Sequence, residues 1–151
     1  MTGSVLQPDL PLAADDGALM RVLRQAGLGR DCVIRVTGPA GLTAVLCLYR
    51  RGYERAAYVH PNWVTVRGAA DCLLIPHACG MQELAGLLER GDGLREGGIL
   101  IVQTCASRSS QPADGLPAIL EPRGYEIEQH VSDRGRAIYI ARRRGGFKKA
   151  A

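Results

Sequence analysis

Short apolar runs and amphipathic stretches alternate along this chain. Apolar or alternating runs of five to seven residues predict strands. These runs cover residues 32–37, 56–60, 71–76, 99–103, 125–131 and 136–141, with a further short run at 63–67. Apolar residues that recur every three or four positions predict helices. The helical stretches cover residues 15–26, 40–51, 81–90 and 116–121.

The helix predicted at 40–51 carries a distinct apolar face. Leu42, Val45, Leu46 and Tyr49 share that face at helical spacing. Two arginines and a glycine follow, and they match a basic last turn with a glycine stop. The spacing therefore predicts both the extent of this helix and its apolar side.

The order of these elements predicts the fold class. Strands that alternate with helices form a mostly parallel sheet, because each helix carries the chain back to the end where the previous strand began. The last two strands alternate in polarity and flank Asp133-Arg134-Gly135, which is a hairpin signal. Residues 106–115 are polar and small and predict a loop. We expect an α/β fold whose mostly parallel sheet is closed by an antiparallel C-terminal hairpin.

Length and charge divide the chain into three parts. The 151 residues fit one domain, which we place at residues 14–142. Residues 1–13 contain two prolines and lack periodicity, which predicts an extended N-terminal arm. Residues 143–151 are predicted to form a basic flexible tail, because the net charge is −3 over residues 1–133 and +7 over residues 134–151.

Apolar runs and cysteine usage indicate the cellular compartment and whether to expect disulfides or a metal. No apolar run approaches the ~20 residues that span a bilayer, and the N-terminus lacks a basic region followed by an apolar stretch. We therefore expect a cytoplasmic protein that does not associate with a membrane. The five cysteines are odd in number and none forms a C-x-x-C pair, so we expect no disulfide framework and no metal.

Residues 32–44 predict a strand, a glycine-containing turn and the start of a helix. This order of elements forms the nucleotide-binding site of Rossmann-type folds. Residues 71–77 then predict a buried strand. Residues 84–102 predict a helix, a Gly-Gly turn and a strand, and residues 116–141 predict a last helix followed by the hairpin. From residue 32 to 144 this order resembles the class I S-adenosylmethionine-dependent methyltransferases. The resemblance implies a Rossmann-like three-layer sandwich.

The resemblance also implies S-adenosylmethionine as the cofactor. Its candidate binding residues follow the first and second strands and are Thr37, Gly38, Gly41, His60 and Asn62. The turn departs from the family's glycine pattern at Thr37 and Pro39, and Arg35 stands where the family carries an acid. Side chains or a proline ring at these positions occupy space where the backbone would approach the cofactor. The pattern therefore indicates altered or lost cofactor binding.

A second resemblance is local. Residues 38–44, followed by 50–53, resemble the FAD-binding turn of flavoprotein oxidoreductases. This segment lacks the first glycine, and no acid follows the next strand. The chain is also short for such an enzyme, so the first resemblance is the one we develop.

Three groups of side chains offer chemistry at the carboxyl ends of the strands. His77 is a candidate general base, or a histidine that caps the start of a helix. His60, His77, Cys79 and Cys105 have zinc-ligand chemistry, although they match no zinc-finger spacing and also read as unrelated core and loop residues. Cys79 or Cys105 is a candidate nucleophile if a helix N-terminus stabilises its thiolate.

Two kinds of partner follow from the charge and the size. The candidate nucleic-acid contacts are the basic residues Arg142, Arg143, Arg144, Lys148 and Lys149, which otherwise form a solvated terminus. A short chain covers its sheet thinly, and a second copy would bury the remainder, which predicts a homodimer. Two functions remain open: a methyltransferase-like scaffold or regulatory protein with weak or absent catalysis, and a small active methyltransferase with His77 near the acceptor.

Overall fold

The computed structural model describes residues 16–60, 69–78, 81–90, 94–104, 112–133 and 136–144. The helices are α1 (Asp16–Gln25), α2 (Gly41–Arg50), α3 (Met81–Arg90) and α4 (Pro112–Leu120), and α4 leads into a 3-10 turn (Glu121–Arg123). The strands are β1 (Ile34–Val36), β2 (Ala56–Tyr58), β3 (Ala70–Ala78), β4 (Leu94–Thr104), β5 (Tyr125–Asp133) and β6 (Arg136–Arg143).

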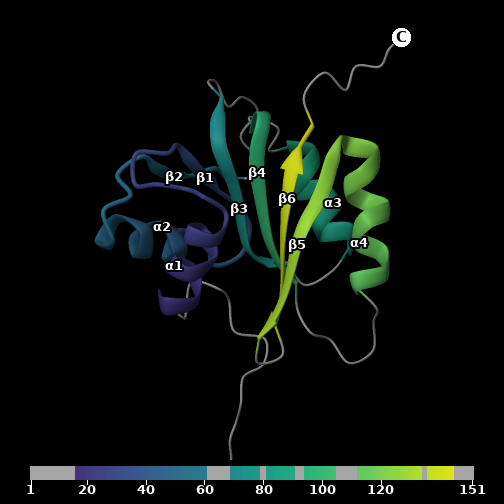
Figure 1. The fold of residues 1–151 in the computed structure, drawn as a ribbon, viewed down its shortest axis with the longest axis horizontal. Helices are drawn as coiled ribbons and strands as arrows, with labels where there is room; N and C mark the ends of the chain where they lie inside the picture. The colour runs from purple at the N-terminus through teal and green to yellow at the C-terminus, as the bar shows by residue number, and fades with distance from the viewer. Residues whose placement is uncertain are drawn as a thin grey trace, which may run out of the picture.

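The six strands form one sheet in the order β2-β1-β3-β4-β6-β5 (Figure 1). Strands β1 to β4 are parallel to one another, and β6 runs antiparallel to both β4 and β5. The last strand therefore lies between its two predecessors rather than at the edge. The mostly parallel sheet with an antiparallel C-terminal pair confirms the predicted fold class.

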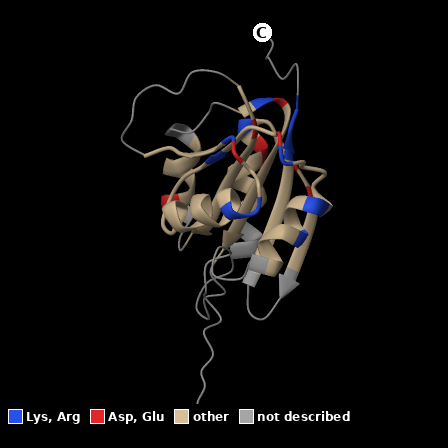
Figure 2. Cartoon of the chain, turned by 90° about the vertical axis from the view of Figure 1, so that its left-hand side faces the viewer, with Lys and Arg blue, Asp and Glu red and all other residues tan. Residues whose placement is uncertain are grey.

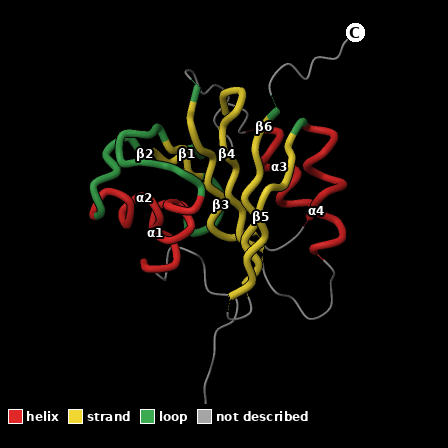
Figure 3. The backbone as a smooth tube through the Cα atoms, viewed as in Figure 1, coloured by secondary structure: helices red, strands yellow, loops and turns green. Residues whose placement is uncertain are grey.

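Helices cover both faces of the sheet and create two hydrophobic cores (Figure 3). On one face α1 and α2 pack against the sheet around Ile34, Leu74 and Ile101. On the other face α3 and α4 pack around Leu100 and Val102. The architecture is a three-layer α/β sandwich. Within the described residues, each helix is too short or too polar to cross a bilayer.

The apolar face of α2 differs from the prediction. Leu42, Leu46 and Tyr49 are exposed at 63%, 58% and 49%, whereas Ala44 and Leu48 are fully buried. The helix carries apolar residues on two sides, so periodicity alone does not identify the side that packs. Val45 is the one residue of the predicted apolar face that is buried.

Several element bounds also differ from the sequence prediction. Helix α4 begins at Pro112, where the sequence predicted a loop, because proline is favoured in the first helical turn. Strand β4 begins at Leu94 and passes through the Gly97-Gly98 step that we predicted as a turn. Strand β6 includes Arg143, one residue beyond the expected domain boundary. The predicted arm at 1–13 and the short run at 63–67 lie outside the described residues.

Candidate functional site

The carboxyl ends of β1, β2, β3 and β4 meet at one edge of the sheet because these strands are parallel. Ligands of open α/β sheets bind at this edge. Thr37 follows β1, and His60 lies two residues beyond β2. His77 is the second-to-last residue of β3, and Thr104 is the last residue of β4. The structure thus brings four polar side chains to the expected edge. Asn62, the remaining candidate cofactor residue, lies outside the described residues.

The turn between β1 and α2 is closed by its own backbone. The N–H of Gly41 donates to the carbonyl of Gly38 at 3.1 Å, and the N–H of Ala44 donates to the carbonyl of Ala40 at 3.1 Å. Gly38 has a φ of 90°. Ala40 has a φ of 67°, the one positive value among the described non-glycine residues. Ala40 has no side-chain oxygen to cap α2, so the helix begins without a side-chain cap.

Side chains of the protein itself fill the space beside both glycines of this turn. A Cβ at Gly38 would lie 3.1 Å from Cδ1 of Leu87 and 3.6 Å from Cγ2 of Ile75. A Cβ at Gly41 would lie 2.6 Å from Cε1 of Tyr58. Contacts under 3.0 Å are closer than packed carbon atoms tolerate, so a side chain at position 41 would require the Tyr58 ring to move.

Thr37 forms hydrogen bonds that link the end of β1 to both neighbouring strands. Its hydroxyl donates to the carbonyl of Val59 at 2.7 Å, and its N–H donates to the carbonyl of Leu74 at 3.1 Å. The side chain is only 3% exposed. The N–H of Val59 in turn donates to the carbonyl of Val36 at 2.8 Å. Thr37 therefore has a structural role between β1, β2 and β3.

The two histidines at this edge differ in environment. His60 is exposed, and its ring lies edge-on to the ring of Tyr58 with centroids 6.4 Å apart. His77 is half-buried inside β3, with a buried Nδ1, so the reading of a histidine at a helix start is wrong. Its carbonyl oxygen would lie 3.9 Å from a Cβ at Gly38, which places His77 beside the turn.

The structure describes some of the cysteines but not the two that the zinc and nucleophile hypotheses need. Cys79 and Cys105 lie outside the described residues, so the zinc and nucleophile hypotheses remain predictions. Across the described part of the chain, no group of three or more histidine, cysteine or acidic side chains is arranged to hold a metal. Cys72 is fully buried, and burial raises the pKa of its thiol. Cys72 is therefore a core residue.

Of the candidate nucleic-acid residues, Arg142, Arg143 and Arg144 are described, and they lie toward the amino ends of the parallel strands. Arg142 donates from Nε to Oε2 of Glu128 at 2.8 Å, and Arg144 pairs with Glu126 at 3.3 Å. Figure 2 shows acidic and basic segments together where β6 leads toward the C-terminus. Arg143 donates to the carbonyl of Leu94.

Glu128 also raises the pKa of Arg142, because its carboxylate accepts the hydrogen bond that stabilises the charged guanidinium. Arg142 and Arg144 therefore pair with glutamates of β5 rather than standing in a separate tail. Lys148 and Lys149 lie outside the described residues.

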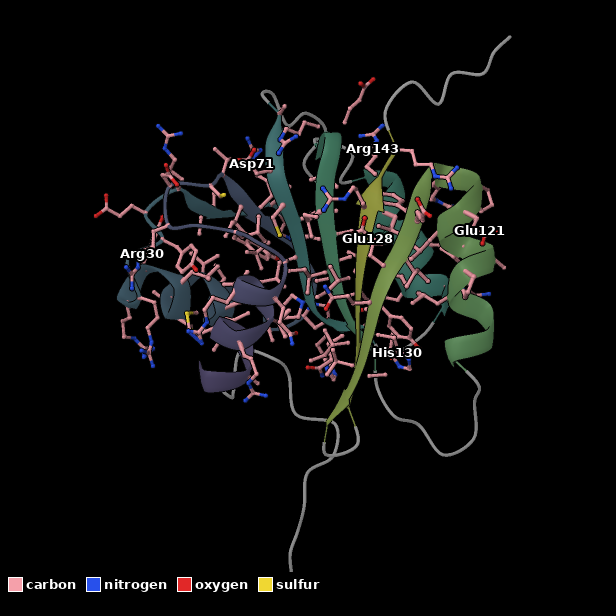
Figure 4. The ribbon with its side chains drawn as sticks, viewed as in Figure 1. Arg30, Asp71, Glu121, Glu128, His130 and Arg143 are labelled. Atoms are coloured by element: carbon pink, nitrogen blue, oxygen red, sulfur yellow. The ribbon has the colours of Figure 1, made fainter. Side chains whose placement is uncertain are left out.

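Sequence reasoning missed Asp71. Its carboxylate accepts the N–H of Val33 at 2.8 Å and Nε of Arg95 at 2.7 Å, and these hydrogen bonds lower the pKa of Asp71 (Figure 4). Asp71 therefore links the start of β3 to Val33, the residue directly before β1. The signal in the sequence was a single acid at the start of an apolar run, where β3 has both faces covered.

Known structures share this architecture at low sequence identity. A SAM dependent methyltransferase from Aquifex aeolicus gives a TM-score of 0.63 at 12% identity over 92% of this chain and 100% of its own. The ribosomal protein L11 methylase from Lactobacillus delbrueckii subsp. bulgaricus gives 0.64 at 11% identity over 85% and 78%. The magnesium protoporphyrin IX methyltransferase from Synechocystis PCC 6803, with bound SAH, gives 0.57 at 14% identity over 95% and 90%.

No protein-family model and no curated protein sequence matches the chain. The sheet order, the two helical layers and the antiparallel closing pair define a Rossmann-like α/β protein. More specifically, the chain has the class I S-adenosylmethionine-dependent methyltransferase-like fold. This confirms the fold that the resemblance in the sequence implied.

Proposed function

We propose that this chain is a methyltransferase-like Rossmann protein that binds a partner and has weak or absent catalysis. The main support for this proposal is that side chains of the protein pack against Gly38 and Gly41. A glycine in a nucleotide-binding turn lets the ligand approach the backbone. Here Leu87 and Tyr58 occupy the space beside Gly38 and Gly41. Internal packing therefore accounts for both glycines without a ligand.

The charges at the site support the same proposal. S-adenosylmethionine carries a sulfonium and an ammonium group, and burying cations requires nearby anionic groups. At the ends of β1 to β4, none of the described residues is a carboxylate. The hydroxyl of Thr37 already donates to Val59, and Arg35 lies in β1. The residues present do not fit this cofactor.

An active S-adenosylmethionine-dependent methyltransferase is the second candidate. It is favoured by the position of His77 beside the turn and by the similarity to a structure with bound SAH. Under this candidate His77 would serve as the general base. Under this candidate His60 and Asn62 would contact the cofactor.

Calorimetric titration of the full chain with S-adenosylmethionine and with S-adenosylhomocysteine separates the two candidates. We expect no saturable heat and no thermal shift at millimolar ligand, because side chains fill the space beside the glycines and the described residues at this edge include no carboxylate. A methyltransferase of known affinity for the cofactor serves as the positive control. Saturable binding with a low-micromolar Kd would contradict the proposal and favour the active enzyme.

A further inference from the structure

Three exposed apolar side chains form a row on α2. Leu42, Leu46 and Tyr49 are 63%, 58% and 49% exposed, and among the side chains that the structure describes no other large apolar one is exposed. Positions separated by four and then three residues lie on one side of a helix. We call Leu42, Leu46 and Tyr49 the α2 stripe.

The α2 stripe lies away from the sheet. The opposite side of the helix, with Ala44 and Leu48, is buried in the core that α2 shares with α1. Figure 1 places α2 at the flank of the molecule, and it packs on β2, the edge strand. A contiguous exposed apolar patch on a soluble domain marks an interaction surface.

A basic cavity lies at the C-terminal end of α2. It has a volume of about 520 Å³ and lies between α1 and the segment that follows α2. Arg24, Arg30 and Arg51 line it over an apolar floor that includes Leu28 and Tyr53, and its lining contains no acidic side chain among the residues described.

Two features fix this cavity relative to the helix. Arg30 donates from Nε to the carbonyl of Arg51 at 2.8 Å, which holds its side chain against the end of α2 (Figure 4). Arg51 is the residue directly after α2 and lies two positions beyond Tyr49. The basic cavity therefore lies at the C-terminal end of the helix that carries the α2 stripe.

The charge around this surface selects its partner. Residues 16–60 contain seven arginines and three acidic residues, a net charge of +4. A second copy that paired stripe to stripe would bring these arginines together, and like charges at an interface oppose binding. Nucleic acid fits the arginines, but Leu42 and Leu46 offer neither stacking nor hydrogen bonds to bases. An acidic partner with an apolar face is complementary both to the α2 stripe and to the arginines of the cavity.

We propose that the α2 stripe and the arginine cavity form one docking surface for an acidic amphipathic helix of a partner protein. Such a helix would pack apolar residues, three and four positions apart, on Leu42, Leu46 and Tyr49. Its carboxylates would pair with Arg30 and Arg51, since arginine binds carboxylates through paired hydrogen bonds. The inference rests on the proposed function, whose partner class it names.

A fluorescein-labelled acidic peptide tests the surface on the full chain. The probe is a helical peptide with leucines on one face and glutamates elsewhere, followed by fluorescence anisotropy at low and high salt. We expect Leu46→Ser to weaken binding about tenfold, as for a central apolar anchor. We expect Arg51→Gln to weaken it about fivefold at low salt and less at high salt, because salt screens exposed charges.

Matched controls separate docking from general effects. Ala118→Ser changes an exposed position on α4, and Arg55→Gln removes one exposed arginine from the same basic segment without lining the cavity. Both should leave the affinity within twofold. A peptide of the same composition with its leucines dispersed around the helix should bind at least tenfold more weakly. Thermal unfolding confirms that each variant is folded.

Three outcomes overturn the inference. They are equal losses in the stripe and control variants, tighter binding to a single-stranded oligonucleotide at the same surface, and a homodimer that Leu46→Ser dissociates. The cofactor titration has a separate readout. Tight S-adenosylmethionine binding would refute the proposed function and leave the peptide result standing, whereas loss of peptide binding would refute only the docking surface.

Discussion

The ring of Tyr58 occupies the space that a side chain at Gly41 would need. Cε1 and Cδ1 of Tyr58 would lie 2.6 and 2.7 Å from a Cβ at position 41. Tyr58 is the last residue of β2, and Gly41 is the first residue of α2. The contact therefore locks the start of the helix against the end of the neighbouring strand, at the edge where a ligand would otherwise approach.

Gly41→Ala should lower the free energy of unfolding by about 1–3 kcal/mol, because an added methyl group overpacks the site. Chemical denaturation measures the change. In a Tyr58→Ala background, where the ring is gone, the same substitution should cost less than about 0.5 kcal/mol. Equal costs in both backgrounds would show that Tyr58 is not the group that requires the glycine.

Thr37→Val should lower the free energy of unfolding by about 1–2 kcal/mol. Valine keeps the shape of threonine but removes the hydroxyl that donates to Val59, and it leaves that buried carbonyl with one partner fewer. Thr37→Ser keeps the hydroxyl and should recover most of the loss. Denaturant midpoints of the three proteins test this order, and a serine variant as unstable as the valine variant would contradict it.

Asp71→Asn should destabilise the fold at neutral pH by about 1 kcal/mol, because charge-assisted bonds to Val33 and Arg95 weaken. The hydrogen bonds from Val33 and Arg95 hold the pKa of Asp71 below the ordinary value of 3.8, so its stabilising effect is present above that pH. The effect is lost as the pH falls through the lower pKa of the folded state.

Urea denaturation between pH 2 and pH 7 tests this dependence. The difference between the unsubstituted chain and Asp71→Asn should shrink as the pH falls below about 4. Asp31→Asn, at an exposed turn, is the matched control and should have an effect within about 0.5 kcal/mol. A difference that does not change with pH would show that Asp71 acts through its shape alone.

Removing residues 145–151 should weaken binding to a single-stranded oligonucleotide more than Arg142→Gln does. Arg142 already pairs with Glu128, so its charge is largely balanced, whereas the removed segment contains Lys148 and Lys149. The salt dependence of the affinity should fall by about one unit of slope, since fewer phosphates are neutralised. Unchanged affinity after the truncation would exclude these lysines from nucleic-acid binding.

The sequence predicts the order and type of the described elements because their patterns are local. The run at 99–103 is apolar at nearly every position, and it forms the centre of β4, buried between two helical layers. The hairpin of β5 and β6 follows from alternating residues around a turn signal. Both features depend on residues close together in the chain, so periodicity suffices to find them.

The candidate site depends on contacts between distant residues, which periodicity does not report. Gly41 and Tyr58 are neighbours only because β2 returns beside β1, and the sequence alone suggested that such a glycine faces a ligand. The exposed side of α2 was missed for a related reason. Apolar residues lie on both sides of that helix, and which side is buried depends on how α2 packs against α1 and the sheet.

The position of β6 between β4 and β5 sets the order in which the sheet is completed during synthesis. A ribosome makes β4 and β5 before β6, yet neither has its antiparallel partner until residues 136–143 emerge. Until then the inner side of β4 is an open edge, which is the kind of surface that joins other chains. A nascent chain arrested before residue 136 would therefore aggregate more readily than the finished protein.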